Sequence, residues 1–320
     1  MNYAVGIDIG GTNTVFGIVS EDGNCICEDK MRTDAFDDVN EYVRVLTAGI
    51  NVLLRSNAGA LERDGEVIGI GIGAPNGNYY KGTVENAPNL KWKGTIRFAD
   101  MMKEYFNLPV VLTNDANAAA IGEMIFGTAK GMKDFIVVTL GTGLGSGFVA
   151  NGQMIYGHTG FAGELGHTII FENGRDCGCG RKGCLETYAS ATGIVRTVKK
   201  ILRNSDENSI LRDLDFEEIT SKKIFEAAQQ GDKIALDAFD YTGKILGLAL
   251  ANAVAITSPE AIILFGGLAL AGDYIFEPTK KYMEAYMLNN FKNTVKLLPS
   301  QIAGKNAAVL GAAAMIFNVS

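Results

Sequence analysis

The sequence AVGIDIGGTNTVFGIVSEDGNCICE, residues 4–28, predicts a strand, a Gly/Thr-rich hairpin, a second strand, an Asp-Gly turn and a third strand. The sequence IVVTLGTGLGSGFVANGQMIYG, residues 136–157, repeats this order, with an Asn-Gly turn before its third strand. Such dipeptides between β-branched residues are strong hairpin signals. Two copies of one device, a little over a hundred residues apart, indicate a duplicated fold that holds one polyphosphate from both sides.

Strands alternate with helices along the rest of the chain. A buried strand at residues 67–73 and a short strand at 109–112 precede an Ala-rich helix, which runs from Asp115 to about residue 126. The other predicted elements are helices at 39–56, over most of 192–250 and at 306–317, and strands at 135–139 and 261–265. This alternation is typical of an α/β fold with parallel strand pairs.

The size and charge of the chain limit its organisation and its partners. At 320 residues it suits two domains, and we expect a small lobe of residues 1–118 with 305–320 and a large lobe of residues 119–304. A net charge of −7 argues against a nucleic-acid surface. The most apolar segment, residues 261–272, is too short to span a bilayer, and no signal-peptide pattern precedes the first strand. We therefore expect a cytoplasmic protein without nucleic-acid or membrane partners.

Two Gly/Thr loops are the candidate phosphate sites. Gly10-Gly11-Thr12 and Gly141-Thr142-Gly143 each lie between strands, where glycine lets backbone N–H groups approach an anion and threonine adds a hydroxyl donor. Asp8 precedes the first loop, and a carboxylate near a polyphosphate usually acts through Mg²⁺. The alternative is two ordinary hairpin turns. The chain has no P-loop motif and no dinucleotide-binding fingerprint followed by a helix.

A cluster of metal-ligand residue types follows the second loop. His167, Cys177, Cys179 and Cys184 lie within 18 residues, and three of the five cysteines of the chain are among them. Thiolate and imidazole ligands favour tetrahedral zinc, and four protein ligands would make the site structural. The alternative is three reduced thiols beside a chance histidine.

Several polar side chains suit an acid–base reaction on a polyol. Asp115 follows a predicted strand and begins a helix, where it could accept a proton from a substrate hydroxyl or simply cap the helix. Carboxylates, imidazoles and amides can pair with hydroxyl groups that both donate and accept. The candidates for such contacts are Asn89, Asn114, Glu164, His167 and Glu186. The alternative for Glu164 and Glu186 is solvated surface charge.

These motifs resemble, in order, those of the ROK family of bacterial sugar kinases. Residues 8–12 (DIGGT) look like the first phosphate motif, residues 140–143 (LGTG) look like the second, and residues 114–117 (NDAN) look like the catalytic segment. Residues 163–187, GELGHTIIFENGRDCGCGRKGCLET, carry the family signature. The sequence departs from the family pattern at Asn13-Thr14, where a lysine is frequent, and at Ser146, which replaces a glycine.

The resemblance implies a function and assigns roles to residues. It implies the duplicated actin-like/hexokinase (ribonuclease H-like) ATPase fold, with two lobes around a cleft, and ATP-dependent phosphorylation of a hexose on its 6-hydroxyl. Residues 189–194 are most similar to the glucokinase branch, so glucose is the expected substrate, with N-acetylmannosamine, N-acetylglucosamine and allose as alternatives. Polyphosphate remains open as the donor. The implied roles are Asp115 as base, Gly266 and Gly267 near the nucleoside, Glu164, His167 and Glu186 on the sugar, and His167 with the three cysteines on zinc.

The family resemblance also bears on assembly and on one rival function. It implies a homodimer. Some members of the family are sugar-responsive regulators that carry an added N-terminal DNA-binding module. Because strand residues begin by position 3 and the net charge is negative, we expect a kinase here and not such a regulator.

Overall fold

The computed structural model describes residues 1–59, 61, 65–302 and 307–318. The chain divides into two compact units. The first contains Met1–Met132, Gly147–Gly163 and Ser300–Ser320, and the second contains Lys133–Ser146 and Glu164–Pro299. The lobes expected from the sequence, divided after residue 118, stay a prediction. Residue 306, where the last helix was expected to begin, lies outside the described residues.

The first stretch forms three neighbouring strands, as predicted. The sheet has the order β3-β2-β1-β4-β8. β1 pairs antiparallel with β2 and parallel with β4, and β4 pairs parallel with β8. The bounds of the strands are β1 Asn2–Ile9, β2 Asn13–Ser20, β3 Cys25–Arg32, β4 Glu66–Gly73 and β8 Val110–Thr113. A small separate sheet is formed by β5 Gly77–Asn78, β6 Thr83–Glu85 and β7 Thr95–Ile96.

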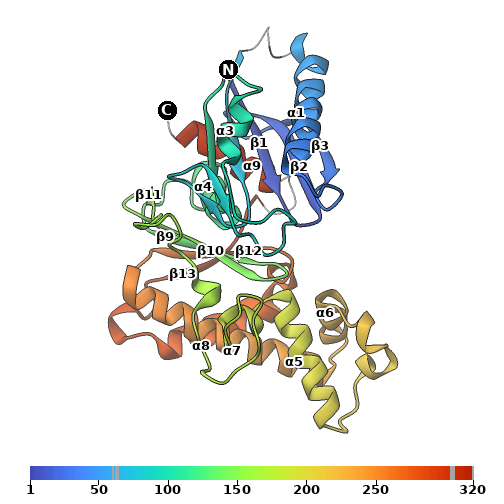
Figure 1. Ribbon diagram of the computed structural model, residues 1–320. Coiled ribbons are helices and arrows are strands. Elements are labelled where there is room, and N and C mark those ends of the chain that lie inside the picture. The colour runs from blue at the N-terminus through green and yellow to red at the C-terminus, as the bar shows by residue number, and fades with distance from the viewer. Residues whose placement is uncertain (60, 62–64, 303–306, 319–320) are drawn as a thin grey trace. The chain divides into compact units, whose positions relative to one another are not determined.

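Helices cover both faces of the first sheet (Figure 1). Alternate residues of β1 point to opposite faces, and Val5, Ile7 and Ile9 join a core with α1 (Val39–Ser56) and α3 (Phe98–Lys103). The other face carries α4 (Asp115–Phe126) and α9 (Ala307–Asn318). Here α9 approaches the strands so closely that a Cβ atom on Gly6 would lie 2.1 Å from the carbonyl oxygen of Val309. The glycines on these strands are thus required by packing.

The second sheet repeats the topology of the first. Its order is β11-β10-β9-β12-β13, so the third, second, first, fourth and fifth strands follow one another in both sheets. β12 pairs parallel with both β9 and β13. The bounds are β9 Phe135–Leu140, β10 Leu144–Ala150, β11 Gln153–Met154, β12 Ala261–Phe265 and β13 Lys296–Pro299. The predicted duplication of the fold is therefore confirmed.

The second unit contains most of the remaining helices. The region 192–250 is mostly helical, as predicted, and its long α7 has a largely buried apolar surface. The bounds are α5 Ala191–Asn204, α6 Ser221–Gln229, α7 Lys233–Thr257 and α8 Asp273–Tyr286. Short 3₁₀ turns, η1 (Leu165–His167) and η2 (Leu185–Thr187), interrupt the irregular segment before α5. Among the described residues, no helix combines the length and apolarity needed to cross a bilayer.

Candidate active site and metal centre

Two aspartates come together where the parallel strands of the first sheet end. The strand register places Asp8 of β1 beside Gly73 of β4, and Gly73 beside Thr113 of β8. Asp115 follows two residues later, in the first turn of α4. A Cβ atom on Gly73 would lie 3.7 Å from Asp8 Oδ1 and 3.6 Å from the Cα of Asp115. Asp8 and Asp115 therefore both lie next to Gly73, near enough for the charge of Asp115 to raise the pKa of Asp8.

Burial of these carboxyl groups changes their acidity. Desolvation, with a further contribution from the charge of Asp115, raises the pKa of Asp8 to about 7. Desolvation also raises the pKa of Asp115, although hydrogen bonds from the backbone N–H groups of Ala116 and of Asp115 itself partly lower it. Asp115 nevertheless keeps a solvent-exposed surface, which limits the size of its shift. A carboxylate with a raised pKa is a stronger proton acceptor, as a general base requires.

The neighbouring residue Asn114, and not Asp115, makes the side-chain cap of α4. Asn114 is the N-cap of α4, and its side-chain oxygen accepts a hydrogen bond from the N–H of Asn117 at 3.0 Å. The Asp115 carboxylate accepts from the N–H of Ala116 at 2.8 Å. The cap thus fixes the backbone that carries Asp115 without using its carboxyl group. The sugar contact expected of Asn114 stays a prediction.

The first Gly/Thr loop closes the β1–β2 hairpin and lies against Asn89. Gly10 N–H donates to the carbonyl of Asn13 at 2.9 Å. A Cβ atom on Gly11 would lie 2.8 Å from the carbonyl oxygen and 3.1 Å from the Cβ of Asn89. The structure therefore brings together a predicted phosphate loop and a predicted sugar contact that lie far apart in the sequence.

A buried polar cluster beneath this loop was not predicted. The hydroxyl of Thr14 lies 2.6 Å from the Tyr42 hydroxyl and 2.8 Å from the Thr33 hydroxyl. Tyr42 packs against Trp92, with ring centroids 4.4 Å apart. The cluster connects the strand after the loop to α1, and no local sequence signal links residues so far apart.

The second Gly/Thr loop is held by the start of α5. Gly141 N–H donates to the carbonyl of Gly143 at 3.1 Å and closes the turn. Ala191 N–H donates to the carbonyl of Gly141 at 2.9 Å, and the Thr192 hydroxyl donates to the carbonyl of Thr142 at 2.7 Å. The backbone conformation of the loop is thus held by the first residues of α5, the helix that follows the segment with the four predicted zinc ligands.

The Gly266-Gly267 turn lies beside the start of this loop. Gly266 has a φ of +98°, and a Cβ atom there would lie 2.8 Å from the carbonyl oxygen of Leu140. The same carbonyl accepts a hydrogen bond from Leu268 N–H at 3.1 Å. The turn and the loop therefore meet at the carboxyl ends of β9 and β12.

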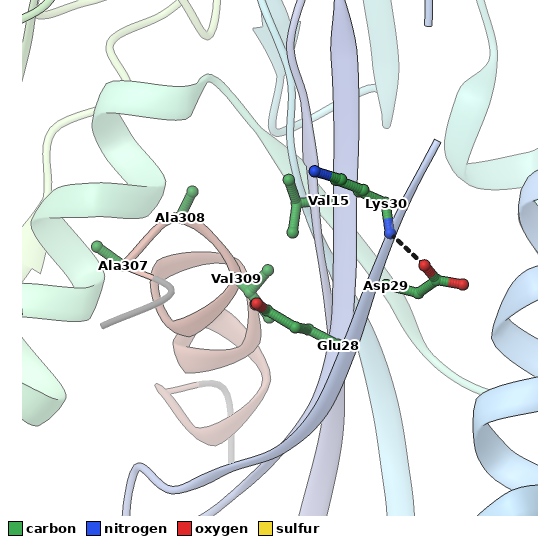
Figure 2. A pocket seen from close by; sticks show the side chains of 7 residues that line it. All are labelled: Val15, Glu28, Asp29, Lys30, Ala307, Ala308 and Val309. Carbon is green, nitrogen blue, oxygen red and sulfur yellow. Dashed lines mark hydrogen bonds between the residues drawn. The ribbon is translucent and has the colours of Figure 1, made fainter. Parts of the chain in front are cut away.

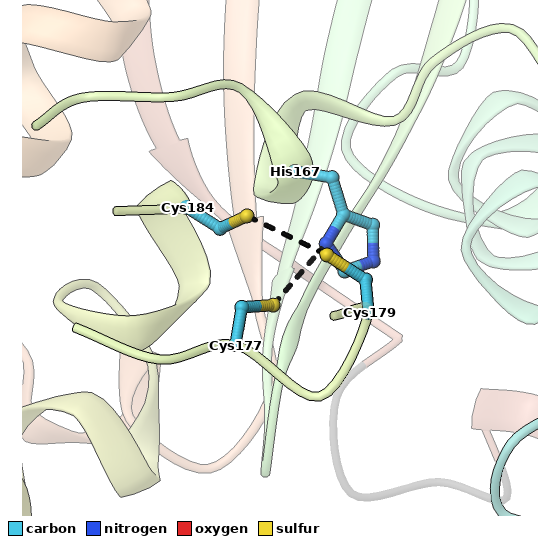
Figure 3. Close-up of side chains that lie close together, drawn as sticks. All are labelled: His167, Cys177, Cys179 and Cys184. Carbon is cyan, nitrogen blue, oxygen red and sulfur yellow. Dashed lines mark hydrogen bonds between the residues drawn. The ribbon is translucent and has the colours of Figure 1, made fainter. Parts of the chain in front are cut away.

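The four predicted zinc ligands gather in one cluster (Figure 3). Their ligand atoms all lie within 4.8 Å of one another. Cys179 Sγ lies 3.7 Å from Cys184 Sγ, and Cys177 Sγ lies 3.7 Å from His167 Nδ1. Tetrahedral zinc with bonds of about 2.3 Å requires sulfur atoms about 3.8 Å apart. The geometry and the donor set therefore fit a structural zinc ion.

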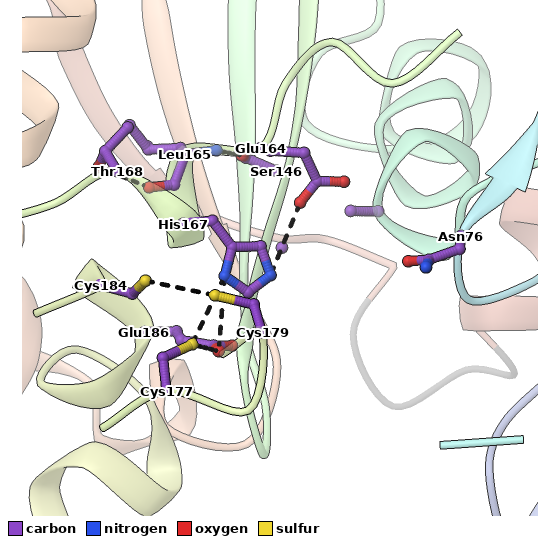
Figure 4. Close-up of polar contacts among 12 residues, drawn as sticks. Asn76, Ser146, Glu164, Leu165, His167, Thr168, Cys177, Cys179, Cys184 and Glu186 are labelled. Atoms are coloured by element: carbon purple, nitrogen blue, oxygen red, sulfur yellow. Dashed lines mark hydrogen bonds and ion pairs between the residues drawn. The ribbon is translucent and has the colours of Figure 1, made fainter. Parts of the chain in front are cut away.

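The imidazole of His167 has neighbours on both sides (Figure 4). Its Nδ1 faces the cysteines, whereas its Nε2 lies 3.9 Å from Glu164 Oε2. Glu186 Oε1 lies 2.9 Å from Cys177 Sγ and 3.7 Å from His167 Nδ1. The three residues predicted to contact the sugar, Glu164, His167 and Glu186, are thus gathered around the cluster.

Ser146, which departs from the family pattern, supports this group of residues. Its hydroxyl accepts a hydrogen bond from the N–H of Leu165 at 3.2 Å, inside the turn that connects Glu164 to His167. Ser146 is buried. The structure thus places the hydroxyl at position 146 under the turn that carries two predicted sugar contacts.

Two pockets on the first unit lie apart from the predicted site residues. One, of about 440 Å³, is a hollow between β3 and the start of α9, where Lys30 and Glu28 face the short side chains of Ala307 and Ala308 (Figure 2). The other, of about 530 Å³, is lined by Asn78, Tyr80, Lys81, Glu85, His158, Thr159 and Phe161. No predicted site residue lines either pocket, so neither is evidence for the site described above.

Comparisons with known proteins agree on the family. The model of the family described as ROK family matches residues 4–318. A glucokinase from Halalkalibacterium halodurans is 36% identical over 97% of this chain and 93% of its own length. A xylose repressor from Caldicellulosiruptor bescii is 32% identical over 98% of this chain and 78% of its own length.

A solved structure shares both fold and sequence with this chain. The ROK family glucokinase from Streptomyces griseus, in complex with glucose and AMPPNP, matches with a TM-score of 0.80 and 34% identity, over 98% of each chain. The chain therefore belongs to the ROK family and has its actin-like/hexokinase fold.

Proposed function

We propose that this protein is a sugar kinase that transfers the terminal phosphoryl group of ATP to the 6-hydroxyl of glucose. One observation carries the proposal: Asp115, with a raised pKa, begins α4 beside Asp8 at the ends of parallel strands. Ligands of open α/β sheets bind at this edge. The similarity to glucokinases and to a structure with bound glucose and AMPPNP supports the choice of sugar and donor.

Asp115 acts as the general base. Phosphoryl transfer depends mainly on alignment and charge stabilisation, and the carboxylate accepts the proton of the attacking hydroxyl. Gly10-Gly11-Thr12 and Gly141-Thr142-Gly143 present backbone amides to the phosphates, and Gly266-Gly267 lies near the nucleoside. Mg²⁺, when bound, neutralises charge on the phosphates. Asp8 is the carboxylate placed to orient the ion through its waters.

The zinc segment forms the sugar contacts. His167 would bind the metal through Nδ1, which faces the cysteines, and would leave Nε2, next to Glu164, for a sugar hydroxyl. Glu186, Asn89 and Asn114 complete the predicted set. Because the protein supplies all four candidate ligands, a zinc ion bound there would be structural and would hold the segment in shape.

Three further expectations belong to the same proposal. The lobes are residues 1–118 with 305–320, and residues 119–304. The protein is a cytoplasmic homodimer. It acts on a small sugar without nucleic-acid or membrane partners.

The test is a substrate panel with the purified zinc-loaded protein. Glucose, N-acetylmannosamine, N-acetylglucosamine and allose are each supplied with Mg²⁺ and either ATP or polyphosphate, and the sugar phosphate is measured by mass spectrometry. Glucose with ATP should give the highest kcat/KM. A preference for another sugar would support the kinase activity but change the assigned substrate. If no combination of sugar and donor gave a sugar phosphate, the proposed kinase activity would be contradicted.

The xylose repressor relative favours a second candidate, a sugar-responsive regulator without turnover. Such a protein would bind a sugar but form no sugar phosphate. Calorimetry with glucose and xylose, run beside the substrate panel, separates the two. Binding of xylose without phosphorylation of any sugar would favour the regulator.

A further inference from the structure

Glu186 lies between the metal cluster and the second phosphate loop. One carboxylate oxygen, Oε1, lies 2.9 Å from Cys177 Sγ. The other, Oε2, would lie 2.6 Å from a Cβ atom placed on Gly143. The carboxylate therefore occupies the space that a side chain at position 143 would need.

The backbone around Glu186 is tied to the same loop. The Ser190 hydroxyl donates to the carbonyl of Glu186 at 2.6 Å and also caps α5. The next two residues of α5 donate to the carbonyls of Gly141 and Thr142. The start of α5 thus holds both the main chain of Glu186 and the phosphate loop. Gly143 of this loop lies next to the end of the Glu186 side chain.

We propose that Gly143 is a positioning residue for the sugar contact Glu186, in addition to its place in the phosphate loop. The inference rests on the proposed function, in which Glu186 accepts a hydrogen bond from a hexose hydroxyl. A methyl group at position 143 cannot share the space of Oε2, so the carboxylate must rotate. Sugar affinity then falls before any nucleotide is bound, although the substitution lies in the nucleotide loop.

The same loop offers a matched control. A Cβ atom on Gly141 would meet no atom within 4 Å, and neither Gly141 nor Gly143 has a positive φ. Gly143→Ala and Gly141→Ala therefore add the same methyl group, and only the first contacts Glu186. Glucose binding is measured by calorimetry without nucleotide, AMPPNP binding is measured separately, and zinc content is measured by elemental analysis.

Gly143→Ala should weaken glucose binding about tenfold, the equivalent of one charge-assisted hydrogen bond. Gly141→Ala should leave glucose affinity within about twofold of the wild type, whatever it does to AMPPNP affinity. Equal glucose affinity in both variants, whether unchanged or reduced, would overturn the inference. If the wild type binds and phosphorylates no sugar, the proposed function fails instead.

If the Gly143→Ala variant alone folds poorly, the same substitution is also tested in the Glu186→Asp variant. Glu186→Asp shortens the side chain and withdraws the carboxylate from Gly143. The loss of glucose affinity caused by Gly143→Ala should then be several-fold smaller beside Glu186→Asp than beside the native glutamate. Equal losses in the two backgrounds would show that the methyl group acts by another route.

Discussion

Asp8→Asn should stabilise the ligand-free protein in neutral and alkaline solution, although it removes a residue assigned to function. Asp8 is largely buried, and the charge of another carboxylate, Asp115, also raises its pKa. Ionising Asp8 is therefore unfavourable in the folded protein, and its pKa rises from 3.8 to about 7. Replacing the carboxyl group with an amide removes the ionisation and keeps the shape.

The pKa of Asp8 sets the size and the pH range of the effect. A rise from 3.8 to about 7 is equivalent to at most about 4 kcal/mol, at about 1.4 kcal/mol for each pKa unit. The pKa of Asp8 is higher in the folded protein than in the unfolded chain, so protonation stabilises the folded wild type. This stabilisation is complete below pH 3.8, decreases as pH rises toward 7, and is lost above pH 7. The difference between variant and wild type should grow by about 2–3 kcal/mol between pH 5 and pH 8, and then level off.

Urea unfolding of the zinc-loaded proteins at several pH values measures this difference. Any hydrogen-bond cost of the introduced amide is the same at every pH, so the pH dependence isolates the ionisation. Asp34→Asn is the control, because the Arg32 side chain lowers the pKa of Asp34. This carboxylate is ionised in both the folded and the unfolded protein above pH 5, so the difference between variant and wild type should not change between pH 5 and pH 8. A pH-independent difference for Asp8→Asn, or a loss of stability that grows with pH, would refute the argument.

Four other predictions concern activity and packing. Asp115→Asn should reduce kcat by about 10²–10⁴-fold, and turnover near that of the wild type would remove Asp115 from the role of base. Removal of zinc with a chelator should weaken glucose binding more than AMPPNP binding in calorimetry, and an intact glucose affinity would contradict the assigned role of the metal. Ser146→Ala removes the acceptor for Leu165 N–H and should weaken glucose binding about fivefold, with AMPPNP affinity as the internal control. Gly71→Ala would place a Cβ atom 1.8 Å from the carbonyl oxygen of Ala312 and should lower the free energy of unfolding by about 3 kcal/mol or more, whereas native-like stability in urea would show that α9 can shift.

The parts of the fold that could be predicted from the sequence are those with local signals. Strand–turn–strand patterns with Asp-Gly and Asn-Gly dipeptides predicted both hairpin stretches, and both are confirmed. The cluster of the four predicted zinc ligands was equally local, because these residues lie within one short segment that folds back on itself. Short elements such as α3 and β13 were not predicted, since six or fewer residues carry too little periodicity.

The contacts that tune the candidate site could not be predicted, because they join distant segments. Nothing near Thr14 in the sequence points to the Tyr42 hydroxyl 28 residues away. The sequence around Ser146 likewise does not predict that its hydroxyl accepts a hydrogen bond from Leu165 N–H, 19 residues away. The raised pKa of Asp8 likewise depends on burial and on Asp115, and both follow from strand register.

The duplicated topology explains where the candidate functional residues lie. In each sheet the first strand and its parallel neighbour end at the same edge, as Asp8 with Gly73 and Thr139 with Phe265 show. Polar loops collect at that edge because the ladder of backbone hydrogen bonds ends there. One copy supplies the two acidic residues. Beside the corresponding edge of the other copy, the segment before α5 supplies the four predicted metal ligands and, through Glu186, reaches the loop after β9. The matching edges of the two sheets thus carry different side chains, and only at the second, where a Cβ atom on Gly143 would lie 2.6 Å from Glu186 Oε2, does a carboxylate depend on a glycine for its space.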